Sequence, residues 1–239
     1  MLCGDAYAPV TSRIGFLRAP LDFVASGLLA WRRAIHGSAE ACRLAGGLRD
    51  NVMALEPLTA GTRPRELLVA TGAPGWTAVF DCGVRGGDQT TTVGYLARSL
   101  RVQGVVVVSV PDVPAAAGRP PRFGARQLEM FGPDMTEFLN YVRTISVVRD
   151  GKRWRFDANG TVQHFEDVEA YSRRKIADRL TGSMLVAYTS ALGLRPFEMD
   201  FFPGPSVLVR NSAEPPAGAL VLSLHAAQQR AGIVAQVNC

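Results

Sequence analysis

A run of four valines near the middle of the chain constrains the fold more than any other stretch. Residues 105–110, VVVVSV, lie between Gly104 and Pro111. Branched side chains fit the pleated surface of a strand, and a continuous apolar run suits a strand that is covered on both faces. The sequence therefore predicts a central strand here, in the middle of a sheet.

Two dipeptides further along the chain predict antiparallel strands joined by tight turns. Asp150-Gly151 and Asn159-Gly160 each separate segments that contain β-branched and aromatic residues. Both dipeptides favour two-residue hairpins, because the turn residues need positive φ angles. Counting outward from the first turn places Trp154 opposite Val147 and puts the aromatic side chains on the core face. The predicted strands cover 141–149, 152–158 and 161–165.

Apolar periodicity predicts the remaining helices and strands. Apolar residues recur at helical spacing over 20–36, and Gly37 follows as a stop signal, which predicts an amphipathic helix. The tail after Pro215 fits either a helix or a strand followed by a helix, and we favour the helix. Further helices are predicted over 93–100, 168–180 and 182–192. Further strands are predicted over 12–19, 66–71, 76–81, 123–131 and 206–210.

The order of these elements predicts the fold class. Strands that arrive mostly as hairpins, with helices between groups of strands, indicate an α+β fold with a mainly antiparallel sheet and helices packed on it. We expect a single domain over 12–210, a flexible N-terminus over 1–11 and a C-terminal extension over 211–239. Residues 111–122, with four prolines and three consecutive alanines, are expected to be a surface connection or a hinge.

The charge of the chain permits a nucleic acid or an acidic partner. The formal net charge is +5 and the pI is about 9.3. Only two of the 26 basic residues are lysines, however. A bias toward Arg, Ala, Gly and Val is typical of GC-rich coding sequences, so we do not expect nucleic-acid binding from the charge alone.

Four scattered cysteines and the lack of long apolar stretches bear on the location of the protein. Cys3, Cys42, Cys82 and Cys239 form no C-x-x-C pair, so we expect free thiols in a reducing compartment and no metal site. No apolar stretch approaches the roughly 18–20 residues of a membrane helix. The N-terminal residues do not resemble a secretory signal. The sequence therefore predicts a cytoplasmic protein with no membrane contact, no metal and no cofactor.

Several short stretches of the central and C-terminal parts carry a resemblance to other proteins. They are Gly75-Trp76-Thr77-Ala78, Phe80-Asp81, Tyr95-Leu96, Tyr141-Val142-Arg143-Thr144-Ile145, Trp154, Phe156, Phe165-Glu166, Asp178-Arg179 and Ala191-Leu192-Gly193. In these stretches the chain resembles a set of uncharacterised bacterial proteins, chiefly from actinobacteria. The resemblance covers about 12–210 and implies a bacterial, cytosolic, single-domain protein without an established activity.

The glycine-rich loop over 81–90, DCGVRGGDQT, is the first candidate for a ligand site. A loop that opens a helix can direct backbone N–H groups and the positive end of the helix dipole at an anion, and an arginine adds a charged fork. Its spacing matches neither the dinucleotide-binding G-x-G-x-x-G motif nor a P-loop, so a plain strand-to-helix connection is the alternative. The candidate ligand-binding residues are Arg85, Gly86, Gly87, Asp88 and Thr90.

Two residues are weak candidates for catalysis. Cys82, near a helix N-terminus, is a candidate nucleophile, and His164, in a polar stretch, is a candidate base. The hydrolase motif G-x-S-x-G and the zinc-peptidase motif H-E-x-x-H are both absent from the sequence. The sequence therefore leaves open whether the protein is an enzyme.

Our leading hypothesis is a non-catalytic interaction protein that binds another protein, in the manner of bacterial immunity proteins. The alternatives are an enzyme or ligand-binding protein with an anion site in the 81–90 loop, and nucleic-acid binding through a basic helix over 173–179. Exposed aromatics and arginines are common at interface hot spots. The candidate interface residues are Trp31, Arg173, Arg174, Phe197, Phe201 and Phe202.

Overall fold

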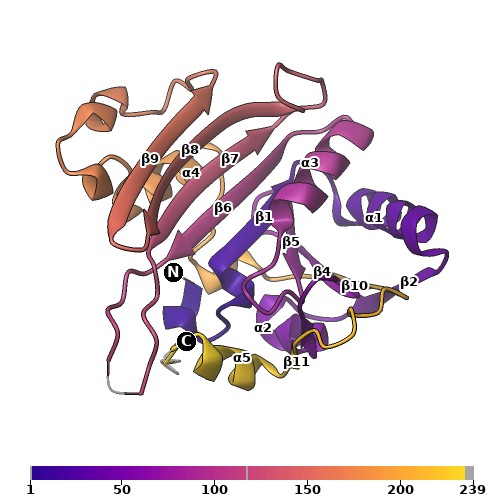
Figure 1. Ribbon diagram of the computed structural model, residues 1–239. Coiled ribbons are helices and arrows are strands. Elements are labelled where there is room, and N and C mark those ends of the chain that lie inside the picture. The colour runs from indigo at the N-terminus through magenta and orange to yellow at the C-terminus, as the bar shows by residue number, and fades with distance from the viewer. Residues whose placement is uncertain (1, 117, 235–239) are drawn as a thin grey trace.

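The computed structural model describes residues 2–116 and 118–234 (Figure 1). Within these residues the α-helices are α1 (Leu21–His36), α2 (Leu48–Asn51), α3 (Gln89–Ser99), α4 (Gly182–Ala191) and α5 (Leu224–Arg230). The strands are β1 (Arg13–Leu17), β2 (Ala39–Leu44), β3 (Leu58–Thr59), β4 (Arg65–Ala70), β5 (Thr77–Asp81), β6 (Gly104–Val110), β7 (Ala125–Phe131), β8 (Tyr141–Asp150), β9 (Arg153–Gly160), β10 (Ser206–Asn211) and β11 (Val221–Leu222). The 3-10 helices are η1 (Leu2–Asp5), η2 (Val10–Ser12), η3 (Val52–Leu55), η4 (Val168–Ser172), η5 (Ile176–Asp178) and η6 (Met199–Phe201).

One large antiparallel sheet organises the molecule. In the described residues it has nine strands in the order β2-β10-β4-β5-β1-β6-β7-β8-β9, and β3 and β11 form a separate pair. All neighbouring strands of the large sheet run antiparallel. The predicted α+β fold, with a mainly antiparallel sheet and helices packed on it, is confirmed.

The valine run lies inside this sheet, as predicted. β6 pairs with β1 on one side and with β7 on the other. Val105 and Val107 point into the larger of two hydrophobic cores, and Val106 and Val108 point into the smaller one. All four side chains are at most 4 % exposed, which is why the run shows no polar alternation.

Helices cover one face of the sheet only in part. On that face α1 packs against β2, β10 and β4, and α3 packs against β5, β1, β6 and β7. Figure 1 shows β8 and β9 extending beyond α3 at the other end of the sheet. On these two strands half-buried or exposed residues alternate with more buried ones, so this end of the face is open.

A buried ion pair ties both helices to the sheet. Arg32 of α1 donates from Nε to Oε2 of Glu66 on β4 and from Nη2 to Oε1, both at 2.6 Å. Thr92 of α3 donates to Glu66 Oε1 and accepts from Arg32 Nη2. The Glu66 side chain is fully buried, so its charge depends on this pairing.

The larger core covers the opposite face and takes in both ends of the described chain. Leu2 and Val10 from the N-terminal segment, and Leu224 and Ala227 from α5, belong to it. The core therefore includes residues outside 12–210, although that range holds the large sheet apart from Asn211 at the end of β10.

The proline-rich segment over 111–122 is an extended connection between β6 and β7. Val113 pairs with Arg122, and Ala116 pairs with Arg119. Figure 1 shows this arm projecting away from the sheet. The arm therefore connects two strands that are neighbours in one sheet.

The β8–β9 hairpin differs in register from the prediction. Asp150 pairs with Arg153, so the turn residues are Gly151 and Lys152, and Val147 lies opposite Phe156 instead of Trp154. A shift of two residues preserves the side-chain alternation, and Trp154 and Phe156 still pack against the larger core. The strand predicted over 161–165 is absent.

The helix predicted over 168–180 is also wrong. That segment contains only the short helices η4 and η5. Arg126 of β7 donates from Nε to the carbonyl of Leu180 and from Nη2 to that of Ala177. These tertiary hydrogen bonds fix the end of the segment against β7. By contrast, α4 forms where predicted, with the Thr181 hydroxyl accepting from the N–H of Met184.

The structure differs from two further predictions, which concern the C-terminal tail and the cysteines. The tail forms β11 followed by α5, which is the alternative to the single helix that we favoured. Cys3 is disulfide-bonded, so the prediction of four free thiols is wrong. Cys42 and Cys82 are free, and Cys239 lies outside the described residues.

Among the residues that the structure describes, no helix is long and apolar enough to cross a membrane.

Candidate functional site

The loop between β5 and α3 is organised by a carboxylate of its own. Asp81 Oδ1 accepts a hydrogen bond from the N–H of Gly83 at 2.8 Å, and Oδ2 accepts one from Asp88 at 3.0 Å. The Arg63 Nε lies 3.3 Å from Oδ2. Burial raises the pKa of Asp81, while Arg63 and these two hydrogen bonds oppose the rise. The amide of Asp88, one of the candidate ligand-binding residues, therefore binds the carboxylate of Asp81 within the loop.

The glycines of this loop are required by close packing. Gly87 has φ +73, and a Cβ atom there would lie 2.5 Å from Asp81 Oδ1. Gly86 has φ +97, and a Cβ atom there would lie 2.7 Å from the carbonyl oxygen of Pro9. Side chains rarely adopt such φ angles. The two glycines thus hold the loop in place, and neither lines the two cavities described below.

Of the candidate ligand-binding residues of this loop, Arg85 lines one of the two cavities described here, and the other four line neither. Arg85 lines a cavity beside the C-terminal tail. The hydroxyl of Thr90 donates to Glu129 Oε2 on β7 at 2.6 Å. Asp88 accepts from the hydroxyl of Thr91, which keeps it at the start of α3.

The second cavity is a groove of about 890 Å³ on the open end of the sheet. Its floor consists of two rows of polar residues that run across β7, β8 and β9 in register. The rows are Gln127, Ser146 and Asp157, and Glu129, Thr144 and Asn159. The loop between β7 and β8 forms a wall that includes Glu137 and Phe138, next to Tyr141.

Glu129 is the most buried carboxylate of the groove. It is 5 % exposed and accepts hydrogen bonds from Thr90 and from the Gln127 amide. Burial raises the pKa of Glu129, against the effect of the Thr90 hydrogen bond and the nearby Arg13 guanidinium. Burial, Glu129 and Asp88 also raise the pKa of Tyr141 to about 12.

The groove is acidic although the chain as a whole is basic. Its lining includes Glu129, Glu137 and Asp157 and contains no Arg, Lys or His. The formal net charge of the chain is +5. A cavity lined by charges of one sign selects ligands of the opposite sign.

Replacing Glu129 with glutamine is expected to stabilise the protein near neutral pH. The raised pKa means that the folded protein holds the proton of Glu129 more tightly than the unfolded chain does. The carboxyl group therefore contributes most to the free energy of unfolding below pH 4.5, its ordinary pKa. That contribution is lost as the pH rises through the pKa of the folded state. Glutamine mimics the protonated form at every pH. Urea unfolding should show a higher free energy of unfolding for Glu129→Gln at neutral pH and little difference in acid. A higher free energy of unfolding for Glu129→Gln at acidic pH only would contradict the raised pKa of Glu129.

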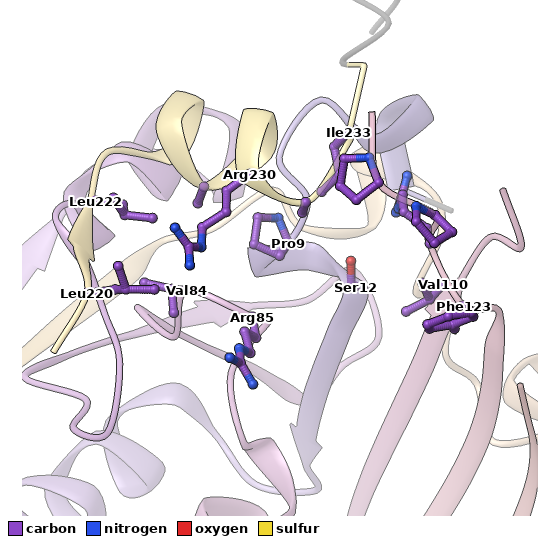
Figure 2. A pocket seen from close by; sticks show the side chains of 15 residues that line it. Pro9, Ser12, Val84, Arg85, Val110, Phe123, Leu220, Leu222, Arg230 and Ile233 are labelled. Carbon is purple, nitrogen blue, oxygen red and sulfur yellow. The ribbon is translucent and has the colours of Figure 1, made fainter. Parts of the chain in front are cut away.

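The first cavity has a volume of about 340 Å³ and has walls from distant parts of the chain (Figure 2). Besides Arg85 it contains Arg122 from the arm and Arg230 from α5. Arg122 pairs with Asp5 at 2.5 Å. The remaining lining is largely apolar and includes Pro9, Val84, Leu220, Leu222, Phe123 and Ile233.

The structure does not bring the two catalytic candidates together. Cys82 is fully buried beside the Thr59 hydroxyl, 3.5 Å from Sγ. Burial raises the pKa of the Cys82 thiol, and a protonated thiol is a poor nucleophile. His164 is exposed and contacts the ring of Phe165. In the part of the chain that the structure describes, no three His, Cys, Asp or Glu side chains are placed to hold a metal ion.

The predicted interface residues are scattered, and two of them are core residues. Phe201 is 1 % exposed and Phe202 is 2 % exposed, because their rings pack on the aromatic side chains of β1 and β5. Phe197 is half-buried against the same core. Neither Phe201 nor Phe202 is therefore available to a partner.

The other three predicted interface residues lie on two separate parts of the surface. Trp31 is half-buried and stacks on Tyr95, with ring centroids 4.1 Å apart. Arg173 and Arg174 are exposed, but they lie between η4 and η5 and not on a helix. They do not form one patch with Trp31.

The groove was missed because its residues look like an ordinary solvated sheet face. Polar side chains at alternate positions of antiparallel strands are normally exposed to water. The only sequence signal was the presence of carboxylates, Glu129 and Asp157, among these polar positions.

Comparisons with protein-family models, with curated proteins and with solved structures find no match to this chain.

Proposed function

We propose that the protein is a binding module that holds a basic segment of a partner polypeptide in its acidic groove. The observation that carries the proposal is a groove of about 890 Å³ lined by Glu129, Glu137 and Asp157 without a basic residue. Complementary charge directs a partner to such a surface and fixes its register. The proposal keeps the interaction-protein hypothesis but moves the interface from the predicted aromatic residues to the open end of the sheet.

The wall of the groove favours a polypeptide over a small amine. Phe138 is 69 % exposed, and its neighbours Met135 and Leu139 are also exposed. Large apolar side chains beside a polar groove are typical of protein interaction sites. A partner segment can thus place a basic side chain near Glu129 while its apolar atoms contact this loop.

Two narrower expectations from the sequence bear on this proposal. An immunity-protein-like role is its specific form, in which the partner would be a toxin with a basic surface. A cytoplasmic location is a second expectation, and the disulfide at Cys3 argues against it, because disulfides persist mainly in oxidising compartments.

The alternative function of nucleic-acid binding loses support, because residues 173–179 do not form the basic helix that it required.

The test compares peptides of opposite charge. A ten-residue peptide of alternating Arg and Ala should bind in a fluorescence anisotropy assay, with affinity that falls as salt is added, whereas the matched Glu and Ala peptide should not bind. Glu129→Gln should weaken binding of the basic peptide by about tenfold, a loss of about 1.4 kcal/mol. Adding Glu137→Gln and Asp157→Asn should weaken it further.

A matched control distinguishes the groove from the general surface. Glu169 is exposed and does not line the groove, so Glu169→Gln should bind the basic peptide like the unmodified protein. Equal binding of the basic and acidic peptides, or unchanged affinity in the variant with all three groove substitutions, would refute the proposed function.

A further inference from the structure

The first cavity is built from segments that are held together by hydrogen bonds. The N–H of Ala60 donates to the carbonyl of Leu220 at 2.9 Å, and that of Val84 donates to Thr59 at 3.1 Å. The Gln228 amide of α5 donates to the carbonyl of Ala6 at 2.9 Å. The tail, the N-terminal segment and the β5–α3 loop are therefore fixed relative to one another around this space.

Two arginines of this cavity have no charged partner in the described part of the chain. Arg85 and Arg230 are exposed, and neither makes an ion pair or a side-chain hydrogen bond there. Arg122, the third arginine of the lining, is already paired with Asp5. The lining includes no Asp or Glu, so the cavity carries a net positive charge.

Apolar side chains lie next to these arginines. Figure 2 shows Leu220, Leu222 and Val84 on the same side of the cavity as Arg230 and Arg85. The volume of about 340 Å³ lies at the lower end of the roughly 300–1,000 Å³ that is common for ligand pockets. Such a lining suits a small molecule with an acidic group and an apolar body.

We infer that this cavity binds a small organic anion, with a carboxylate or phosphate group paired to Arg85 and Arg230 and an apolar body against Val84, Leu220 and Leu222. Guanidinium groups donate pairs of hydrogen bonds to either type of anion. The inference does not rest on the acidic groove, which shares no lining residue with the cavity.

Isothermal titration of the full chain with four eight-carbon probes tests the inference. Octanoate and octyl phosphate share an apolar body with octanol and octylamine but carry a negative charge. We expect at least one of the two anions to bind, and we expect neither octanol nor octylamine to compete with it. Whichever anion binds more tightly identifies the acidic group as carboxylate or phosphate.

Variants locate the binding. Arg85→Ala and Arg230→Ala should each weaken binding of the better anion by about tenfold, the loss expected for one charge-assisted hydrogen-bonded pair. Both side chains are exposed, so the variants should fold, which circular dichroism can check. Arg119→Ala is the matched control, because this exposed arginine lies on the arm that contributes Arg122 but is not part of the cavity lining.

Three outcomes would overturn the inference. They are the failure of both anions to bind at millimolar concentration, equal binding of octanol, and unchanged anion affinity in both arginine variants. Glu129→Gln should leave anion binding unchanged, so a failure of the proposed peptide groove and a failure of this site can be told apart.

Discussion

Replacing Arg32 with leucine is expected to lower the free energy of unfolding by about 3–5 kcal/mol, because it leaves a buried charge without its partner. Glu66 is 0 % exposed, and both of its oxygens accept from the Arg32 guanidinium. The hydroxyl of Thr92 is the other side-chain donor to that carboxylate in the described structure. Loss of Arg32 removes the charge that compensates Glu66 and loosens the attachment of α1 to β4.

Urea unfolding at neutral pH measures this effect, and two further variants interpret it. The double variant Arg32→Leu with Glu66→Leu should recover most of the lost stability, because apolar replacement of a whole buried pair is often neutral. Arg43→Leu is the control, since Arg43 and its partner Asp22 are both exposed, and surface pairs contribute about 0–1 kcal/mol. A loss for Arg32→Leu as small as that of the control would mean that water reaches Glu66.

Replacing Phe202 with alanine is expected to cost about 3–5 kcal/mol of stability, as for other large aromatic residues in cores. Its ring centroid lies 6.3 Å from that of Phe16, 5.7 Å from that of Phe80 and 5.4 Å from that of Phe201. Truncation opens a cavity that these neighbouring rings, packed from β1, β5 and η6, can only partly fill.

The same variant decides between a core and an interface role for Phe202. If Phe202 is a core residue, its replacement by alanine lowers the midpoint of denaturation. If it is an interface residue, the replacement changes partner binding and leaves the free energy of unfolding almost unchanged. Phe138→Ala is the control, because that ring is 69 % exposed and exposed substitutions usually change stability by about 0.5 kcal/mol or less. Equal stability of Phe202→Ala and Phe138→Ala would contradict the packing described for η6.

The parts of the fold that follow from local pattern could be predicted from the sequence. The valine run, the amphipathic α1 and the capped α4 each depend on spacing within one segment, and each lies close to its predicted range. The turn before β9 depends on which residues adopt the positive φ angles. Gly151, with φ +60, is the first turn residue rather than the second, so counting from Asp150 gave the wrong register.

The candidate sites could be predicted only in part, because they depend on distant segments. Arg85, a candidate anion ligand from the sequence, lines a cavity whose other walls include Arg230 and Leu222 of β11, more than a hundred residues later. Glu129 becomes distinctive only because α3 covers the sheet as far as β7 and leaves β8 and β9 open. The position at which a helix layer stops is set by tertiary packing and not by the alternation of residues within the strands.

The strand order also determines how late in synthesis the sheet can be completed. β10 lies between β2 and β4 and pairs with both. After Leu44 leaves the ribosome, roughly 160 more residues must be made before Ser206 follows. At about 5–20 residues per second this takes about 8–30 s. During that time β2 has no strand beside it, so the nascent chain exposes an unpaired edge that a chaperone can cover.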